Sequence, residues 1–323
     1  MLGEPDSICE VKLMWSYDEF VAKAELYFKR SANHDRVDDE FSLWLLLGLE
    51  FLLRAPLAKL HPSLLVALNN GDSILHANGV RTNSRTGPKS ATISDVIDRL
   101  QYIVDDFGAD RQADASYLVN LRNSELHTSA DALRSADESW LPRFAGVARV
   151  LCSHLDVPVE DLVDKDILRE ASALQVKIDK EIERQVREKF LRAKHLFADL
   201  TEGEVRARRS TFSLRPDPSP NHEEPYPCPV CKSRGDLLLV PGRTVKRRFD
   251  EEDNQFVQDV IFVARSFDCP VCKLNLPDTS SVAAAGIRRV HQRSVEEDRY
   301  EGWEDSTRED DGSAWARFSS LID

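Results

Sequence analysis

Two matching segments, Cys-Pro-Val-Cys-Lys at residues 228–232 and again at 269–273, constrain the fold of this 323-residue chain more than any other feature. A Cys-x-x-Cys turn lets two thiolates reach one ion, and two such turns complete a tetrahedral site. We therefore expect a structural zinc ion in a zinc ribbon. The expected ligands are Cys228, Cys231, Cys269 and Cys272. Because thiolates fill every position, this ion has no open site for catalysis.

The segment between the two cysteine turns has the pattern of a β-hairpin. Residues 237–240 and 256–267 have the apolar, β-branched and aromatic content of strands. Residues 243–248 and 250–254 would form its oppositely charged tip. Zinc ribbons resemble one another in binding nucleic acid or protein partners. Lys246, Arg247 and Arg248 suit RNA contact, whereas the acidic residues beside them count against it.

The first half of the chain has the periodicity of a helical bundle. Helical spacing is expected over residues 16–32, 38–53, 92–104 and 141–155. The second of these segments is apolar nearly all round, as in a central buried helix. A long helix with few breakers follows at 165–200, either as a packed arm that extends a dimer or as a helix lying back on the bundle. The expected fold class is mainly α, with the small β zinc ribbon near the C-terminus.

One further helix has an unusual polar composition. After a polar start at residues 108–114, apolar residues recur at three- and four-residue spacing and lead into Leu-Arg-Asn-Ser-Glu-Leu-His at 121–127. At about 100° per residue, Asn123 and His127 share one face, whereas Arg122 lies roughly 140° from His127. Val119 and Leu126 form a narrow apolar strip between them. Two copies packed about a two-fold axis through this strip would bring the arginine of one towards the histidine of the other.

The segment Arg122-Asn123-x-x-x-His127, set in a chain of helices, resembles the Arg-x(4–6)-His motif of HEPN domains. The resemblance covers roughly the first half of the chain and is specific only around residues 121–127. It implies an all-helical domain that dimerises and, in many members, a metal-independent endoribonuclease. In that case Arg122 contacts the scissile phosphate, His127 serves the proton transfers or positions the 2′-hydroxyl, and Asn123 orients them. The family's roles in toxin systems and phage defence would apply by analogy.

Blander interpretations of the same residues stay open. The motif helix can be a solvated face with a histidine near its C-terminal end, where positive charge suits the helix dipole. Glu50 is the one carboxylate in the apolar run at residues 41–53 and needs a partner. That partner is either Arg54, one helical turn away, or Arg122. Cys9 and Cys152 lie outside the metal pattern and are expected to be core or near-surface thiols.

The domain boundaries follow from these segments. We expect a HEPN-like helical domain at residues 1–163, a helical arm at 164–200 and a linker at 201–226, rich in arginine and then in proline. The zinc ribbon then spans 227–276. A C-terminal helix, placed at 282–292, and an acidic tail complete 277–323.

Composition limits the classes of function. With 41% hydrophobic and 31% charged residues the chain resembles an ordinary globular protein. A net charge of -13 excludes coating of nucleic acid by bulk electrostatics, although a local basic cleft remains compatible with it. The start has no secretory signal pattern, and the most apolar stretch, residues 43–53, is too short to span a bilayer. We therefore expect a cytoplasmic location and no membrane.

Three functions compete at this level, the third being a regulator that binds DNA through the ribbon. The first is an endoribonuclease that cleaves an RNA substrate by 2′-hydroxyl transesterification at a homodimer cleft. The second is a non-catalytic dimeric scaffold whose zinc ribbon binds a protein or nucleic acid. The acidic tail is a further candidate contact for a protein partner, or simply a solubilising segment.

Overall fold

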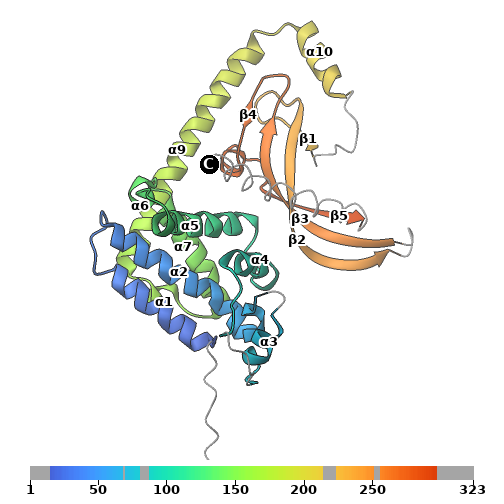
Figure 1. Cartoon of the computed structure of the whole chain (residues 1–323). Helices are drawn as coiled ribbons and strands as arrows, with labels where there is room; N and C mark the ends of the chain where they lie inside the picture. Colours follow the sequence, from blue (N-terminus) through green and yellow to red (C-terminus); the bar gives the residue numbers. More distant parts are fainter. Residues whose placement is uncertain (1–14, 68–69, 81–86, 214–222, 251–254, 297–323) are drawn as a thin grey trace, which may run out of the picture. The chain divides into compact units, whose positions relative to one another are not determined.

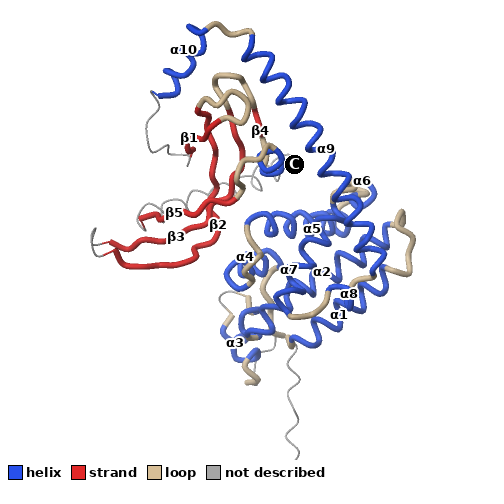
Figure 2. Tube along the Cα trace, turned by 180° about the vertical axis from the view of Figure 1, so that it is seen from behind, coloured by secondary structure: helices blue, strands red, loops and turns tan. Residues whose placement is uncertain are grey.

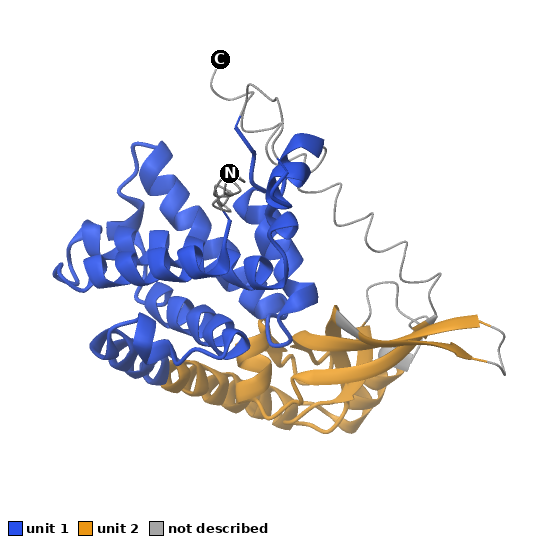
Figure 3. Cartoon of the chain, turned by 90° about the horizontal axis from the view of Figure 1, so that it is seen from below, with its two compact units in different colours: residues 1–178 blue, residues 179–323 orange. Residues whose placement is uncertain are grey.

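A computed structural model describes residues 15–67, 70–80, 87–213, 223–250 and 255–296. The chain divides into two compact units, residues 1–178 and 179–323 (Figure 3). Each unit has its own hydrophobic core. The boundary between the two units falls inside a long helix.

In the described part of the first unit every named element is a helix, and loops and a single β-bridge between Val66 and Ser90 make up the rest (Figure 2). Its elements are α1 (Tyr17–Ser31), α2 (Asp39–Leu60), η1 (Pro62–Leu65), α3 (Gly71–Ala77), α4 (Ile93–Ile103), α5 (Ala109–His127), α6 (Ala132–Ser135), α7 (Trp140–Leu155) and α8 (Val159–Leu162) (Figure 1). The mainly helical prediction is confirmed. The expected N-cap of α1 is also present, because the Ser16 side chain accepts a hydrogen bond from the Glu19 amide at 3.4 Å.

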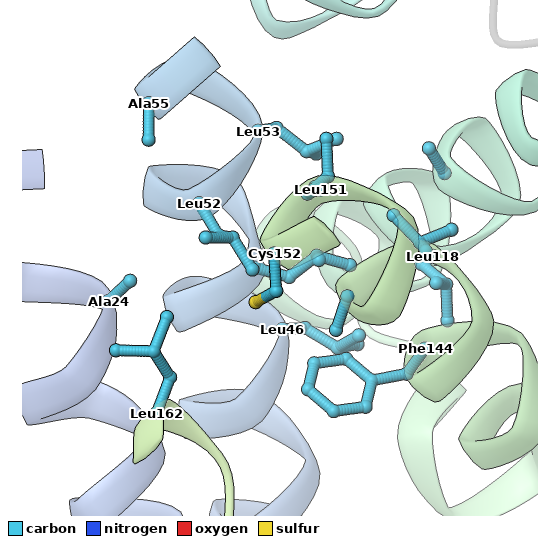
Figure 4. Close-up of a cluster of buried hydrophobic side chains, with 14 of the residues drawn as sticks. Ala24, Leu46, Leu52, Leu53, Ala55, Leu118, Phe144, Leu151, Cys152 and Leu162 are labelled. Carbon is cyan, nitrogen blue, oxygen red and sulfur yellow. The ribbon is translucent and has the colours of Figure 1, made fainter. Parts of the chain in front are cut away.

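Helix α2 is the centre of this unit and packs against α1, α4, α5 and α7. It continues to Leu60, past the end predicted at residue 53, with Pro56 inside the helix. Proline removes one backbone hydrogen bond, but Ala55, Pro56 and Leu57 are all buried, and this burial favours continuation of the helix. Figure 4 shows leucines of α2 lying beside Leu118 of α5 and Phe144 and Leu151 of α7.

By length and composition alone, α2 could cross a membrane. Of its most apolar 18-residue stretch, 67% is buried inside the protein, as expected for the core helix of a globular unit.

Helix α9 (Lys165–Ala198) is one continuous helix of 34 residues that belongs to both units. Its early apolar residues Ile167, Leu168 and Ala171 lie in the core of the first unit. Its later residues Val186 and Ala193 lie in the core of the second. Apolar residues in the early and late parts of α9 therefore serve two separate cores within one chain.

The second unit continues with α10 (Glu202–Ser213) and an antiparallel sheet. Its strands are β1 (Glu223–Pro227), β2 (Arg234–Asp250), β3 (Gln255–Asp268), β4 (Asn275–Leu276) and β5 (Val290–Glu296), with α11 (Thr279–Ala284) before the last strand. The order is β1-β2-β3-β4, and β5 also pairs with β3. The predicted hairpin is present, but β2 extends through residues 243–248, which the sequence pattern assigns to its tip.

Two sequence assignments in this unit are wrong. Residues 201–226, expected to be a linker, include helix α10 and strand β1. The helix expected at 282–292 ends at Ala284, and the chain returns as β5. Gly286, at φ 76°, turns the chain after α11, and the edge of β3 then offers β5 backbone partners. The acidic tail beyond residue 296 lies outside the described residues.

The close packing of α1 on α2 requires a residue without a side chain at Gly48. A Cβ atom at this position would lie 2.6 Å from two ring atoms of Phe28, a side chain with no exposed surface. We expect Gly48→Ala to lower the free energy of unfolding of the first unit by about 1–3 kcal/mol, because the core must shift to admit the methyl group. Urea denaturation followed by circular dichroism measures this loss.

Gly71→Ala is the matched control, because nothing lies within 4 Å of the position that its methyl group would take at the start of α3. Equal unfolding free energies for the two variants would contradict the proposed close packing of α1 and α2.

Candidate functional site

The two Cys-x-x-Cys turns sit in loops at one end of the sheet. The first follows β1 and the second follows β3, and the two have the same backbone geometry. The amide of Lys232 donates to the Cys228 carbonyl at 3.1 Å, and that of Lys273 donates to the Cys269 carbonyl at 2.9 Å. The backbone of both lysines is in the left-handed helical region, with φ 59°. Pairing of β2 with β3 brings these two turns together.

The four cysteine sulfurs form one buried cluster. All lie within 4.8 Å of one another, and the Cys228–Cys272 and Cys231–Cys269 Sγ atoms are each 3.6 Å apart. A disulfide requires about 2.05 Å, so these are separate thiols. Four sulfurs around one ion with bonds of about 2.3 Å would lie about 3.8 Å apart. The structure thus brings together all four predicted ligands in an arrangement that can hold a metal ion.

The protonation of the cluster also favours a cation. Hydrogen bonds from the Cys269 and Cys272 thiols lower the pKa of Cys228 to about 4, and the Cys228 and Cys269 contacts raise the pKa of Cys272. Adjacent thiols therefore resist simultaneous ionisation. A divalent ion removes this conflict, because it stabilises every thiolate that it binds.

Helix α10 supports both cysteine turns, which sequence reasoning missed. Arg208 Nη1 donates to the Val271 carbonyl inside the second turn at 2.7 Å. Arg209 Nε donates to Ser233 Oγ, just after the first turn, at 3.0 Å. The only sequence signal was a basic cluster in the predicted linker, so nothing indicated that these arginines contact the two cysteine turns.

The motif residues Arg122, Asn123 and His127 all lie on α5, as predicted. They do not form a site within one chain: no hydrogen bond or ion pair joins any two of them in the described structure. His127 is the last residue of the helix and is exposed, and Asn123 is half-buried. The Arg122 side chain is only 11% exposed and turns to another partner.

That partner is Glu50 of α2. One carboxylate oxygen of Glu50 accepts from Arg122 Nη2, and the other lies 3.2 Å from Arg54 Nη2. Both partners considered from the sequence therefore contact Glu50 at once. Burial lowers the pKa of Arg54, the Glu50 carboxylate raises it, and the neighbouring Arg122 lowers it again. Glu50 thus fixes the orientation of the motif arginine.

The expected apolar strip on α5 is not a surface feature. Val119 is 7% exposed and belongs to the core of the first unit, whereas Leu126 is 45% exposed. Helix α5 packs against α4, α7 and α2, and this packing buries Val119. Of the two residues in the expected strip, Leu126 alone is therefore exposed near His127.

Cys152, which lies outside the metal pattern, takes no part in the cluster. Cys152 is buried on α7 (Figure 4), and burial, with a contribution from Glu160, raises the pKa of its thiol to about 12. It is a core thiol, which agrees with one of the two expectations. Cys9 lies outside the described residues.

The outer part of the β2–β3 hairpin exposes aromatic rings. Phe249 and Phe256 are cross-strand partners, 48% and 51% exposed, with ring centroids 5.2 Å apart. The Arg247 guanidinium lies 5.3 Å from the centroid of Phe256. The basic residues singled out from the sequence thus lie along a strand beside an exposed aromatic pair.

Comparison of the chain with protein-family models, with curated proteins and with solved structures gave no match. The functional argument therefore depends on the residues and their geometry.

Proposed function

We propose that the chain is a metal-independent endoribonuclease of the HEPN type, active as a homodimer. The observation that carries the proposal is the ion pair between Arg122 of the motif and Glu50 of α2, which holds the arginine in a fixed orientation. The exposed His127 at the end of the same helix is open to a macromolecular substrate. An arginine held beside a carboxylate and a histidine open to solvent suit phosphate contact and proton transfer, respectively.

The chemistry requires only these side chains. The 2′-hydroxyl oxygen attacks the adjacent phosphorus while neutral His127 accepts its proton, and the bond to the 5′-oxygen breaks. The departing 5′-oxygen takes a proton from water, which leaves a 2′,3′-cyclic phosphate and a free 5′-hydroxyl. Arg122 stabilises the negative charge that develops on the non-bridging oxygens. Asn123 orients the reacting groups.

Two copies supply the complete site. Within one helix, Arg122 and His127 lie roughly 140° apart, so a single copy presents them on different faces. A partner chain that packs near the exposed Leu126 would place its histidine beside this arginine. The interface proposed here includes Leu126 and omits the buried Val119.

We also propose that the four-cysteine cluster binds zinc. Sulfur separations of 3.6 Å suit a tetrahedral Zn²⁺ site with bonds of about 2.3 Å. Cys228, Cys231, Cys269 and Cys272 would hold the ion, whose contribution is to the folding of the sheet, because no ligand position is left for substrate.

The nuclease proposal predicts that Arg122→Ala and His127→Ala each lower the rate of RNA cleavage in EDTA by about 10²–10⁴-fold, the range for loss of one acid–base or charge-stabilising group. The wild type should leave 2′,3′-cyclic phosphate ends, which end-mapping of the products detects. Arg169→Ala and His195→Ala are matched controls, because both side chains are exposed and far in sequence from the motif.

Folding and dimerisation of each variant are checked by circular dichroism and by light scattering. Cleavage that survives both motif substitutions, or products with 3′-hydroxyl ends, would exclude this mechanism.

The zinc proposal predicts one zinc ion per chain by elemental mass spectrometry. Cys231→Ser should abolish stoichiometric zinc and unfold the sheet, because metal binding supplies the folding free energy of such modules. Cys152→Ala is the control: it also removes one buried thiol, but it should keep the zinc ion and destabilise only the first unit. Full zinc content in Cys231→Ser would refute the four-thiolate site.

A second candidate function, a binding module without catalysis, is favoured by the hairpin. Two exposed rings, with Arg247 stacked on one of them, form a platform of the kind on which bases of single-stranded nucleic acid stack. Phe249→Ala with Phe256→Ala should weaken binding of single-stranded RNA, at about 1–3 kcal/mol per stacked base, in a gel-shift titration. Val290→Ala, which truncates a comparably exposed side chain of β5, should leave binding unchanged.

A further inference from the structure

The contact that orients Arg122 leaves a surplus of positive charge. Two guanidinium groups, those of Arg54 and Arg122, share the single carboxylate of Glu50. The side chains are 12%, 11% and 20% exposed, respectively, so solvent screens them only in part. No other ion pair with either arginine is formed in the described parts of the chain. The cluster therefore carries a net charge of about +1 in a mostly buried position, which is unfavourable without a further anion.

The same cluster has hydrogen-bond donors to spare. Arg54 Nη1 and Arg122 Nε are fully buried and have no acceptor within the described structure. Each arginine contacts Glu50 through its Nη2 atom. A guanidinium group has five N–H donors, so one such contact leaves most of them without this partner. Unpaired donors on two neighbouring guanidinium groups point to a missing acceptor that carries several oxygens.

We propose that Arg54 and Arg122 together form a binding site for a phosphate diester group, with Glu50 as the built-in competitor that holds both arginines in the absence of this ligand. Guanidinium forks match the oxygens of phosphate, and a diester carries one negative charge, which equals the surplus of the cluster. This inference rests on the proposed ribonuclease function for the identity of its ligand. It assigns to Arg54, which lies outside the motif, direct contact with the substrate backbone.

The two arginines come from two helices that pack against each other. Arg54 lies one helical turn after Glu50 on α2, whereas Arg122 comes from α5, which packs against α2. When a phosphate oxygen replaces one carboxylate oxygen, the two guanidinium groups turn about their existing positions and their unpaired donors gain acceptors. The carboxylate still compensates one arginine, so the occupied cluster is neutral.

Binding is measured with a fluorescent 2′-O-methyl oligoribonucleotide, which has diester groups but no 2′-hydroxyl to attack. We expect Arg54→Gln to weaken binding by about 10–100-fold, the loss of one charge-assisted contact. Arg54→Lys should recover part of the affinity, because it keeps the charge but not the fork. Arg169→Gln is the matched control: it removes the same charge from an exposed ion pair and should stay within about twofold of the wild type. Wild-type affinity in Arg54→Gln overturns the inference.

A second measurement separates anion binding from a merely structural network. Glu50→Gln removes the competitor, so we expect a lower melting temperature in chloride and a larger rise on addition of inorganic phosphate, at matched ionic strength, than the wild type shows. Glu50→Gln with Arg54→Gln should lose this extra rise. A phosphate effect of the same size in the wild type and in Glu50→Gln contradicts the site, since a general salt effect acts on both proteins equally.

The two proposals fail in different ways. Oligonucleotide binding that depends on Arg54, without cleavage of ordinary RNA, keeps the phosphate site and rejects the nuclease. Cleavage that depends on Arg122 and His127, with an unchanged KM in Arg54→Gln, keeps the nuclease and rejects the phosphate site.

Discussion

The burial of α2 is the constraint on which the first unit depends. Its apolar residues face several neighbouring helices, so a carboxylate in its middle must find partners inside the protein. Glu50 finds two, Arg54 on its own helix and Arg122 on α5. The same packing that builds the core therefore sets the orientation of the motif arginine. Stability and the candidate site share one interaction here, and a change to either has consequences for the other.

The core of the second unit includes groups from outside its sheet. Four buried thiols lie among the core side chains, and the later turns of α9 contribute Val186 and Ala193 to the same cluster. Helix α10 fixes the cysteine turns through two arginines that donate to their backbone and to a neighbouring hydroxyl. A metal ion bound by the four thiols would stabilise this fold further. The helices outside the sheet add to its core.

The charge of the chain is distributed unevenly, which matters for any acidic ligand. A net charge of -13 repels nucleic acid at long range, yet two of the sites described above carry clustered positive charge. One is the pair of arginines around Glu50, where low exposure reduces screening. The other is the basic strand beside the exposed rings of the hairpin. Binding of RNA by such a protein would depend on these local sites and on short-range contacts.

The sequence by itself determined what depends on local patterns. The Ser16 cap, the continuous α9 and the matched cysteine turns all follow from spacing within a few residues, and the turns also implied that their four thiols meet. Tertiary structure decided the rest. Helix α2 passes through Pro56 because its neighbours bury that segment, and residues 290–296 form a strand because the edge of β3 is available. The burial of Val119 and the double contact of Glu50 depend on how α5 packs against other helices, and no pattern along a single helix contains that information.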